Sequence, residues 1–424
     1  MRVRWFLIAA LCAVFALGVA ACGDDEEGGG GGGKVEGNTL TIYSSLPMQG
    51  SNRPQSLDVV DGMKLALQQR GGKIGNFTIQ YKQLDDSTAQ AGKWDPGATQ
   101  ANARKVQQDK TSIAVLGEFN SGASAISIPL TNRAGILQVS PANTALELTK
   151  DAGPEDKGAP EKYYPSGKRN YGRVIPADHI QGAAQADWQQ ELGVKKLYVL
   201  NDKEVYGVGV AKTTADAAAK RGIEVLGNEG IDPKAPNYRA VAAKIKAAGA
   251  DAVFFGGITQ NNAGQLFKDL GAAMPDVKLF GPDGVVETEF TKVLPEDVQA
   301  RTYLTVATID PKDYPAKGQK FFKDFEAAYG KAKPEPYAIY GYEAMDVVLD
   351  AIERAGPKAN DRQAVIDAFF ATKDKEGVVG TYDIDKDGDT TANQFGRYLV
   401  KGGEAEFNET VEVKEDSFGR PLGQ

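Results

Sequence analysis

The sequence predicts a doubly wound α/β protein, and two observations support that prediction. From Thr39 onward, short runs of β-branched and aromatic residues alternate with longer stretches of helical character. Alternation of strand and helix is typical of parallel sheets that are covered by helices on both faces. The chain has 424 residues, which is enough for two or three domains of roughly 150 residues each. Two similar α/β halves are therefore expected.

The expected elements follow one another at regular intervals. Short apolar runs predict buried parallel strands at residues 40–43, 77–83, 113–116, 137–139, 196–200, 252–255 and 278–280. Helices are expected between them, at residues 55–70, 97–108, 207–221, 238–248 and 260–270. In the fourth helix, Val241, Ile245 and Ala248 recur at the spacing of one helix face, and Gly249 is expected to end the helix.

Composition excludes several classes of protein. Hydrophobic residues make up 42% and charged residues 25% of the chain, as in soluble globular proteins. The formal net charge of −8 argues against nucleic acid as a partner. Only one histidine is present, His179, and the two cysteines, Cys12 and Cys22, both lie in the first 22 positions. A disulfide, a thiolate metal site and a cysteine nucleophile are therefore not expected in the folded part, and we expect no metal and no cofactor.

The N-terminus has the features of a targeting segment. Arg2 and Arg4 precede an apolar stretch, residues 5–19, that is short for a membrane span but suits a signal peptide. Val19-Ala20-Ala21-Cys22 resembles a bacterial lipobox, in which the cysteine is lipidated and becomes the mature N-terminus. Residues 1–21 are thus a predicted lipoprotein signal peptide, and residues 22–38 are a lipidated cysteine with a glycine-rich tether. The alternative is a secretory signal with a chance cysteine.

Candidate ligand-binding residues lie in loops that follow the predicted strands, because open α/β sheets bind ligands beyond the carboxyl ends of their strands. These loops are residues 117–122, 140–144, 201–207, 256–258 and 281–285. Ser121 begins a predicted helix, where free N–H groups and the helix dipole favour an anion, although a serine there also serves as a helix cap. Asp283 lies between Pro282 and Gly284, a sequence that also suits a plain turn.

The loops, in this order, resemble those of type I periplasmic binding proteins, and within them the branched-chain amino acid (Leu/Ile/Val) receptors of ABC importers. The resemblance spans about residues 40–395 and includes the segments Leu46-Pro47-Met48-Gln49-Gly50, Ser140-Pro141-Ala142-Asn143-Thr144, Tyr206-Gly207 and Gly281-Pro282-Asp283-Gly284. It implies a Venus-flytrap fold of two doubly wound lobes with three interlobe crossovers. The N-terminal lobe would hold residues 39–176 and 307–387, and the C-terminal lobe residues 177–306 and 388–424.

The resemblance also implies a set of ligand-binding residues between the lobes. Ser121 would face the ligand carboxylate, Asp283 would pair with its ammonium group, and Tyr206 would contact it on closure. The backbone of Ala142, with Asn143 beside it, and the hydroxyl of Thr144 would face the amino-acid head group. Structural alternatives are a capping role for Thr144 and plain packing for Tyr206.

Three residues bear on the identity of the ligand. Gln55 and Ile258 stand where the branched-chain receptors place aromatic residues, so the pocket is expected to be less aromatic than theirs. Glu118 lies beside the Ser121 loop, where it either recognises a cationic or amide-bearing ligand or is a solvated loop acid. We favour the solvated acid and expect a branched-chain or related amino acid as the ligand.

The resemblance implies a monomeric, non-catalytic binding protein that is lipid-anchored on the outer face of the cytoplasmic membrane and delivers its solute to a permease. One alternative is the ectodomain of a ligand-sensing receptor for amides or other small solutes. Another is a hydrolase built on Ser121 and His179, against which the lack of a G-x-S-x-G motif counts. His179 is instead expected to be a structural residue at an interlobe crossover.

One segment imitates a metal site. Residues 383–389 match the first half of an EF-hand calcium loop, with Asp383, Asp385 and Asp387 at alternate positions and Gly388 after them. The twelfth position is occupied by Gln394, where such a loop needs a bidentate glutamate. An acidic turn between strands is therefore the favoured interpretation.

Overall fold

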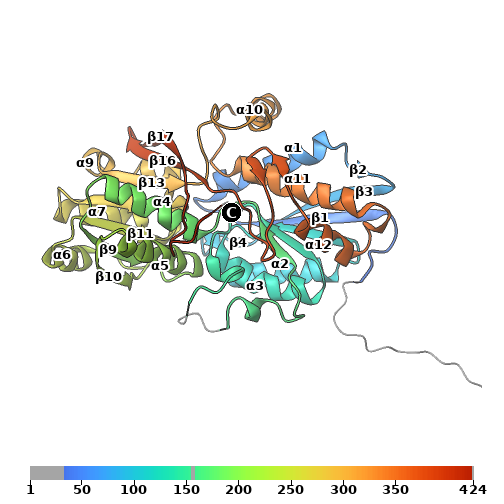
Figure 1. Cartoon of the computed structure of the whole chain (residues 1–424), viewed down its shortest axis with the longest axis horizontal. Helices are drawn as coiled ribbons and strands as arrows, with labels where there is room; N and C mark the ends of the chain where they lie inside the picture. The colour runs from blue at the N-terminus through green and yellow to red at the C-terminus, as the bar shows by residue number, and fades with distance from the viewer. Residues whose placement is uncertain (1–32, 154–157, 423–424) are drawn as a thin grey trace, which may run out of the picture.

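A computed structural model describes residues 33–153 and 158–422, which form two α/β lobes side by side (Figure 1). The predicted signal peptide and Cys22 lie outside the described residues. Lys34 and Val35, which the sequence assigned to the tether, are held to the first lobe. Val35 is buried and its N–H donates to the carbonyl oxygen of Asn360 at 2.7 Å. Val35 packs on this lobe because an apolar side chain gains by burial, while the tether at residues 22–38 stays a prediction.

The first lobe is built on a six-stranded sheet with the order β2-β3-β1-β6-β7-β8. Strand β1 pairs in parallel with β3 on one side and with β6 on the other. The strands are β1 (Thr39–Leu46), β2 (Lys73–Ile74), β3 (Phe77–Asp85), β6 (Ser112–Gly117), β7 (Leu137–Ser140) and β8 (Tyr171–Arg173). Its helices are α1 (Arg53–Gln69), α2 (Pro96–Gln108), α3 (Ser121–Arg133), α11 (Ala338–Ala355) and α12 (Arg362–Phe370). A small hairpin, β4 (Ser87–Thr88) with β5 (Lys93–Trp94), follows β3.

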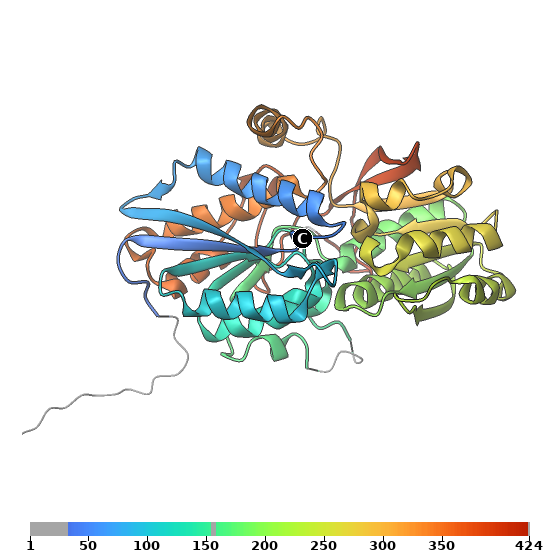
Figure 2. The same ribbon diagram turned by 180° about the vertical axis from the view of Figure 1, so that it is seen from behind.

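Helices α1 and α11 pack together on the first lobe, whereas α2 packs on α3 (Figure 2). Two glycines allow α1 and α11 to approach closely. A Cβ atom at Gly62 would lie 2.2 Å from the carbonyl oxygen of Ala338, and one at Gly341 would lie 2.1 Å from that of Val59. No larger residue fits at either position. This contact brings the start of α11 close to α1, and both helix starts face the second lobe.

The second lobe is built on a seven-stranded sheet with the order β10-β9-β11-β12-β13-β16-β17. The strands are β9 (Lys196–Asn201), β10 (Glu224–Gly230), β11 (Ala252–Gly256), β12 (Lys278–Gly281), β13 (Thr302–Val306), β16 (Gln394–Lys401) and β17 (Glu404–Glu412). Strand β16 runs antiparallel to both β13 and β17, so this sheet is mixed rather than wholly parallel. Its helices are α4 (Asp178–Glu191), α5 (Val205–Lys220), α6 (Arg239–Ala248), α7 (Ala263–Ala273), α8 (Thr288–Thr291) and α9 (Glu296–Gln299).

The chain crosses between the lobes three times within the described residues: after β8, after β13, and between β15 and β16. The second crossing leads to α10 (Ala316–Tyr329), and the third follows the hairpin of β14 (Lys375–Gly377) and β15 (Gly380–Tyr382). Short 3₁₀ turns are η1 (Leu146–Leu148), η2 (Glu161–Tyr163), η3 (Thr259–Asn261), η4 (Asp283–Val285) and η5 (Gly356–Lys358). The predicted fold class is confirmed, while the residue boundaries of the lobes stay a prediction.

The described C-terminal residues return to the first crossover between the lobes. Ser417 donates two hydrogen bonds to the carbonyl oxygen of His179, from its N–H at 2.8 Å and from its hydroxyl at 2.7 Å. The imidazole of His179 stacks on Phe418. Ser417 and Phe418 thus pack on the first crossover.

Candidate ligand-binding site

A small cavity of about 20 Å³ lies between the lobes. The first lobe contributes Asn52, Gln55, Phe119, Asn120, Ser121, Ala142 and Tyr337, and the second contributes Tyr206, Ile258, Asp283, Gly284 and Glu287. None of these described lining residues is basic. Pockets that hold small molecules usually measure ~300 Å³ or more, so the side chains of the two lobes nearly fill this cleft. Admitting a ligand therefore requires the lobes to separate or the lining side chains to move.

Asp283, at the start of η4, is the most tightly held polar group of the cavity. Its Oδ1 accepts a hydrogen bond from the Tyr206 hydroxyl at 2.7 Å, and its Oδ2 accepts one from the Tyr337 hydroxyl at 2.6 Å. Tyr337 precedes α11 of the first lobe, so the second bond joins the lobes. Burial raises the pKa of Asp283, although the tyrosine hydroxyls oppose that shift. A carboxylate held in this way is suited to an ammonium group, which forms a stronger hydrogen bond than a neutral donor.

The N-terminus of α3 faces the same cavity from the first lobe. Asn120 occupies the N-cap position, but its side chain makes no capping bond and its Oδ1 has no hydrogen-bond partner. Ser121 is the first helical residue, and its hydroxyl oxygen accepts a hydrogen bond from the N–H of Ala145 at 3.3 Å. Ser121 is therefore not the cap, and its hydroxyl proton is directed elsewhere. The positive end of this 13-residue helix favours a carboxylate.

Glu287, which precedes α8, lies in the cavity beside two glutamine side chains. Its Oε1 accepts from Nε2 of Gln55 at 3.3 Å across the lobes, and its Oε2 accepts from Nε2 of Gln260 at 3.1 Å. Burial raises the pKa of Glu287 to about 8. The cavity thus contains two acidic side chains whose partners are neutral.

Six of the predicted site residues line the cavity: Gln55, Ser121, Ala142, Tyr206, Ile258 and Asp283. Asn143 does not, because both ends of its amide are used inside the first lobe. Its Nδ2 donates to the carbonyl oxygen of Phe119 at 2.8 Å and its Oδ1 accepts from Tyr171 at 3.0 Å. Thr144 is buried outside the lining, and its hydroxyl has no hydrogen-bond partner. The ligand-binding roles of all these residues stay predictions.

Glu118 is neither solvated nor part of the cavity lining, so the favoured prediction for it is wrong. Its side chain is 1% exposed and lies beside the buried carboxyl of Asp86. Burial raises the pKa of Glu118 to about 7, and burial together with Glu118 raises that of Asp86. Glu118 follows the end of β6 and is buried inside the lobe, whereas the next residue, Phe119, lines the cavity.

Six lining residues were not among the predicted site residues: Asn52, Phe119, Asn120, Gly284, Glu287 and Tyr337. Phe119 and Asn120 belong to the loop before Ser121, so the rule that ligands bind at strand ends would have found them. Glu287 follows Asp283 by four residues and could have been considered with it. Asn52 lies in the loop between β1 and α1, where the same rule applies. Tyr337 has no local signal, because it reaches the cavity through the packing of α11 on α1.

A second set of contacts closes the mouth of the cleft. Lys93 of the β4–β5 hairpin donates from Nζ to Glu204 at 2.5 Å and to Oδ1 of Asn261 at 2.7 Å. The indole N–H of the half-buried Trp94 donates to the same glutamate at 3.1 Å. Glu204 and Asn261 belong to the second lobe, so these bonds hold the lobes in the closed arrangement.

The acidic loop at residues 383–389 is neutralised by side chains of the protein. Nζ of Lys150 lies 2.6 Å from Asp385, 2.9 Å from Asp387 and 3.2 Å from Asp389. The buried Arg173 guanidinium also donates to Asp389 at 2.7 Å. Burial alone would raise the pKa of Asp389, but these two cations hold it well below its usual range. A lysine ammonium thus occupies the position that a calcium ion would need, and no cluster of metal-ligating side chains occurs among the described residues.

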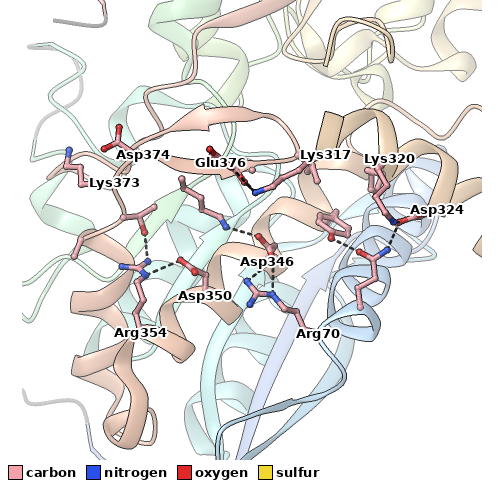
Figure 3. Close-up of a pocket in the computed structure, with 18 residues that line it drawn as sticks. Arg70, Lys317, Lys320, Asp324, Asp346, Asp350, Arg354, Lys373, Asp374 and Glu376 are labelled. Carbon is pink, nitrogen blue, oxygen red and sulfur yellow. Dashed lines mark hydrogen bonds and ion pairs between the residues drawn. The ribbon is translucent and has the colours of Figure 1, made fainter. Parts of the chain in front are cut away.

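A wider hollow of about 740 Å³ lies on the outside of the first lobe, between α1, α10, α11 and residues 371–378 (Figure 3). It is rich in charges, but they pair with one another. Asp346 accepts from Arg70 at 3.1 Å and from Lys375 at 2.7 Å, and Asp350 accepts from Arg354 at 3.0 Å. These internal ion pairs give a ligand little to bind, so we assign the site to the cleft.

Comparison with known proteins agrees with the fold. The family model described as "Periplasmic binding protein" matches residues 39–403. The chain belongs to this family, and the expected kinship with the type I members related to Leu/Ile/Val receptors is confirmed. It is a solute-binding protein, and its relatives are binding proteins rather than enzymes.

Two curated relatives and one solved structure illustrate the similarity. The chain is 28% identical to an amino acid binding protein of Pseudomonas aeruginosa over 76% of this chain and 79% of that protein. It is 25% identical to the Leu/Ile/Val-binding protein homolog 1 of Brucella suis over 96% of this chain and 99% of that protein. The crystal structure of a leucine binding protein, LivK, from Thermotoga maritima superposes with a TM-score of 0.75 at 22% identity, covering 88% of this chain and 99% of that one. Within the part of the chain that the structure describes, every helix falls short of the length or the apolar character needed to cross a membrane.

Proposed function

We propose that this protein captures a free amino acid in the cleft between its lobes and delivers it to the permease of an ABC importer. The observation that supports the proposal is Asp283, a buried carboxylate between the lobes whose partners are two tyrosine hydroxyls. On the opposite wall, Ser121 begins α3. A zwitterion can satisfy both walls at once, with its ammonium on Asp283 and its carboxylate at the start of α3.

Closure around the ligand requires a hinge, and the three crossovers provide it. The bonds from Tyr337 to Asp283 and from Lys93 to Glu204 form only when the lobes meet. A permease would distinguish the closed, loaded form from the open form by its shape. The lipid anchor at Cys22, the extracytoplasmic location and the monomeric state are parts of this proposal.

The similarity to binding proteins for amino acids in Pseudomonas and Brucella supports an amino acid as the ligand. The hydrolase alternative finds no support in the geometry of its two residues. His179 packs under Phe418 at the first crossover, and the Ser121 hydroxyl accepts from a backbone N–H. Burial lowers the pKa of His179 to about 4.

The test is a thermal-shift and calorimetric screen of the purified chain against free amino acids, repeated with Asp283→Asn. A ligand that binds only the folded state must raise the melting temperature. We expect at least one amino acid to do so, and we expect the variant to bind it about a hundredfold more weakly because its ammonium loses a charged partner. Unchanged affinity in a folded Asp283→Asn variant would contradict the assigned site, and a folded wild-type protein that binds no amino acid would contradict the proposed ligand class.

A further inference from the structure

The acidic side chains at the cleft are more numerous than one amino-acid head group requires. Asp283 accounts for the α-ammonium of the proposed ligand, but Glu287 lines the same cavity and is 5% exposed. Buried glutamates are rare unless a cation pairs with them. The partners of Glu287 are two side-chain amides, from Gln55 and Gln260, and the Thr259 hydroxyl. Among the described lining residues, no lysine, arginine or histidine is available to balance its charge.

Glu287 also lines a second space of about 360 Å³ at the surface. Gln55 and Glu287 line both spaces, so they form the boundary between them. The outer space is bordered by Glu289, Glu335 and Glu404, against a single base, Lys292. A low-dielectric cleft lined by one sign of charge raises the local concentration of oppositely charged solutes.

The inner cavity also contains polar atoms that the protein leaves without partners. Asn52 and Asn120 are at least nine-tenths buried, and each has one side-chain amide atom that makes no hydrogen bond. Both line the cavity beside Ser121. Buried polar groups normally have partners, so these atoms mark the place where the head group of a ligand would bind. The head group is then held in the inner cavity, and its side chain extends toward Glu287.

We propose that the amino acid bound by this cleft has a long, positively charged side chain, whose cationic end pairs with Glu287 while its α-ammonium pairs with Asp283. This inference rests on the proposed function and adds the class of amino acid. A short or branched apolar side chain would leave Glu287 buried without a cation and would not reach the acidic outer space. A long basic side chain would supply the cation for Glu287 and would reach the acidic outer space.

The test compares ligands that differ only in charge. Lysine and norleucine have nearly the same shape, as do arginine and citrulline, and only the first of each pair has a cationic side chain. We expect the full chain to bind at least one basic amino acid about tenfold or more tightly than its neutral counterpart in isothermal titration calorimetry. In Glu287→Gln this preference should fall to about threefold or less, while the affinity for the neutral counterpart is kept.

A matched control lies in the outer hollow of the first lobe, where Glu376→Gln removes a carboxylate far from the cleft and should leave the preference unchanged. Glu287→Gln preserves the shape of the side chain, so its circular dichroism spectrum should match that of the wild type. If leucine or norleucine binds as tightly as lysine, or if Glu287→Gln keeps the full preference, the inference is overturned and the proposed function stands. If a folded chain binds none of these amino acids, the inference is overturned, and the proposed function fails as well only if no other free amino acid binds.

Discussion

The interlobe cavity and the outer hollow of Figure 3 are both rich in acidic residues, yet the two regions balance these charges differently. In the outer hollow, Asp346 and Asp350 pair with Arg70, Lys375 and Arg354. In the cavity, Asp283 and Glu287 accept from neutral groups, the hydroxyls of tyrosine and threonine and the amides of glutamine. The difference suggests a rule for acidic side chains. One that is paired with a base of the protein stabilises the fold, whereas a buried one with neutral partners is available to a ligand.

The largest difference between the two regions is expected for stability, when Asp346 of the outer hollow is replaced. Asp346→Asn leaves Arg70 and Lys375 without their shared partner, and breaking a partly buried pair of this kind costs about 3 kcal/mol. Chemical denaturation followed by circular dichroism should show that loss in the free energy of unfolding. Ligand affinity should stay within about threefold of the wild type, because additivity holds for distant sites. A large loss of affinity would show that the outer hollow takes part in binding.

The pH dependence of stability tests the cavity half of the comparison, through the titration of Glu287. The pKa of Glu287, about 8 in the folded chain against an ordinary 4.5, means that the folded state binds this proton more tightly than the unfolded state. Stability without ligand must therefore fall as pH rises from about 4.5 to 8. Glu287 faces Gln55, Gln260 and Thr259, with Glu289 and Glu335 nearby raising its pKa further.

Glu287→Gln removes this titration, so its melting temperature should decline by a few degrees less than that of the wild type over the same pH range. Some decline remains, because the pKa values of Glu118 and Asp86 are also raised by burial. Equal slopes for the variant and the wild type would mean that Glu287 titrates normally.

A smaller effect is expected when the two tyrosines at Asp283 are compared. Tyr337 reaches Asp283 from the other lobe, whereas Tyr206 belongs to the same lobe. Tyr337→Phe should shift the unliganded protein toward the open form by about 1–2 kcal/mol, the worth of one such hydrogen bond. Small-angle scattering would show the opening as a larger radius of gyration. Tyr206→Phe is the matched control, and an equal opening in both variants would contradict the interlobe role of Tyr337.

The smallest effect is expected from calcium. Lys150 pairs with three of the four aspartates of the loop at residues 383–389, and Lys373 pairs with the fourth, Asp383. A divalent cation therefore gains no free carboxylate there. Calcium at about 1 mM should leave the melting temperature of the wild type unchanged to within about 1 °C. A clear rise would mean that calcium displaces the lysine, and Lys150→Met would then bind it more tightly still.

The regular part of the fold could be predicted because its signals are local. Each strand expected before residue 281 is present, since buried parallel strands appear as short apolar runs. The antiparallel hairpin of β16 and β17 was not predicted, although Gly402 and Gly403 mark its turn and apolar residues recur in the strands before and after it. The strands that were expected all lie earlier in the chain, and this hairpin completes the edge of the second sheet.

The candidate site was predictable only where it follows strand ends. Ser121 and Asp283 lie in loops that the general rule for α/β sheets identifies. Tyr337 was missed because its place depends on how closely α11 approaches α1 at Gly62 and Gly341. Glu118 was misjudged because a sequence does not show which way a loop side chain points. The sequence did not identify residues whose position depends on tertiary contacts rather than on a local pattern.

The position of Trp94 links closure of the cleft to the fluorescence of the protein. Of the three tryptophans in the chain, Trp188 packs edge-on against Phe280 and Tyr303 inside the second lobe, and Trp5 lies outside the described residues. The Trp94 indole bonds to Glu204 across the mouth. When the lobes part, that indole moves into water and its emission shifts to longer wavelengths. The protein therefore contains a natural fluorophore at its moving edge, and stopped-flow fluorescence can time each opening and closing without a label.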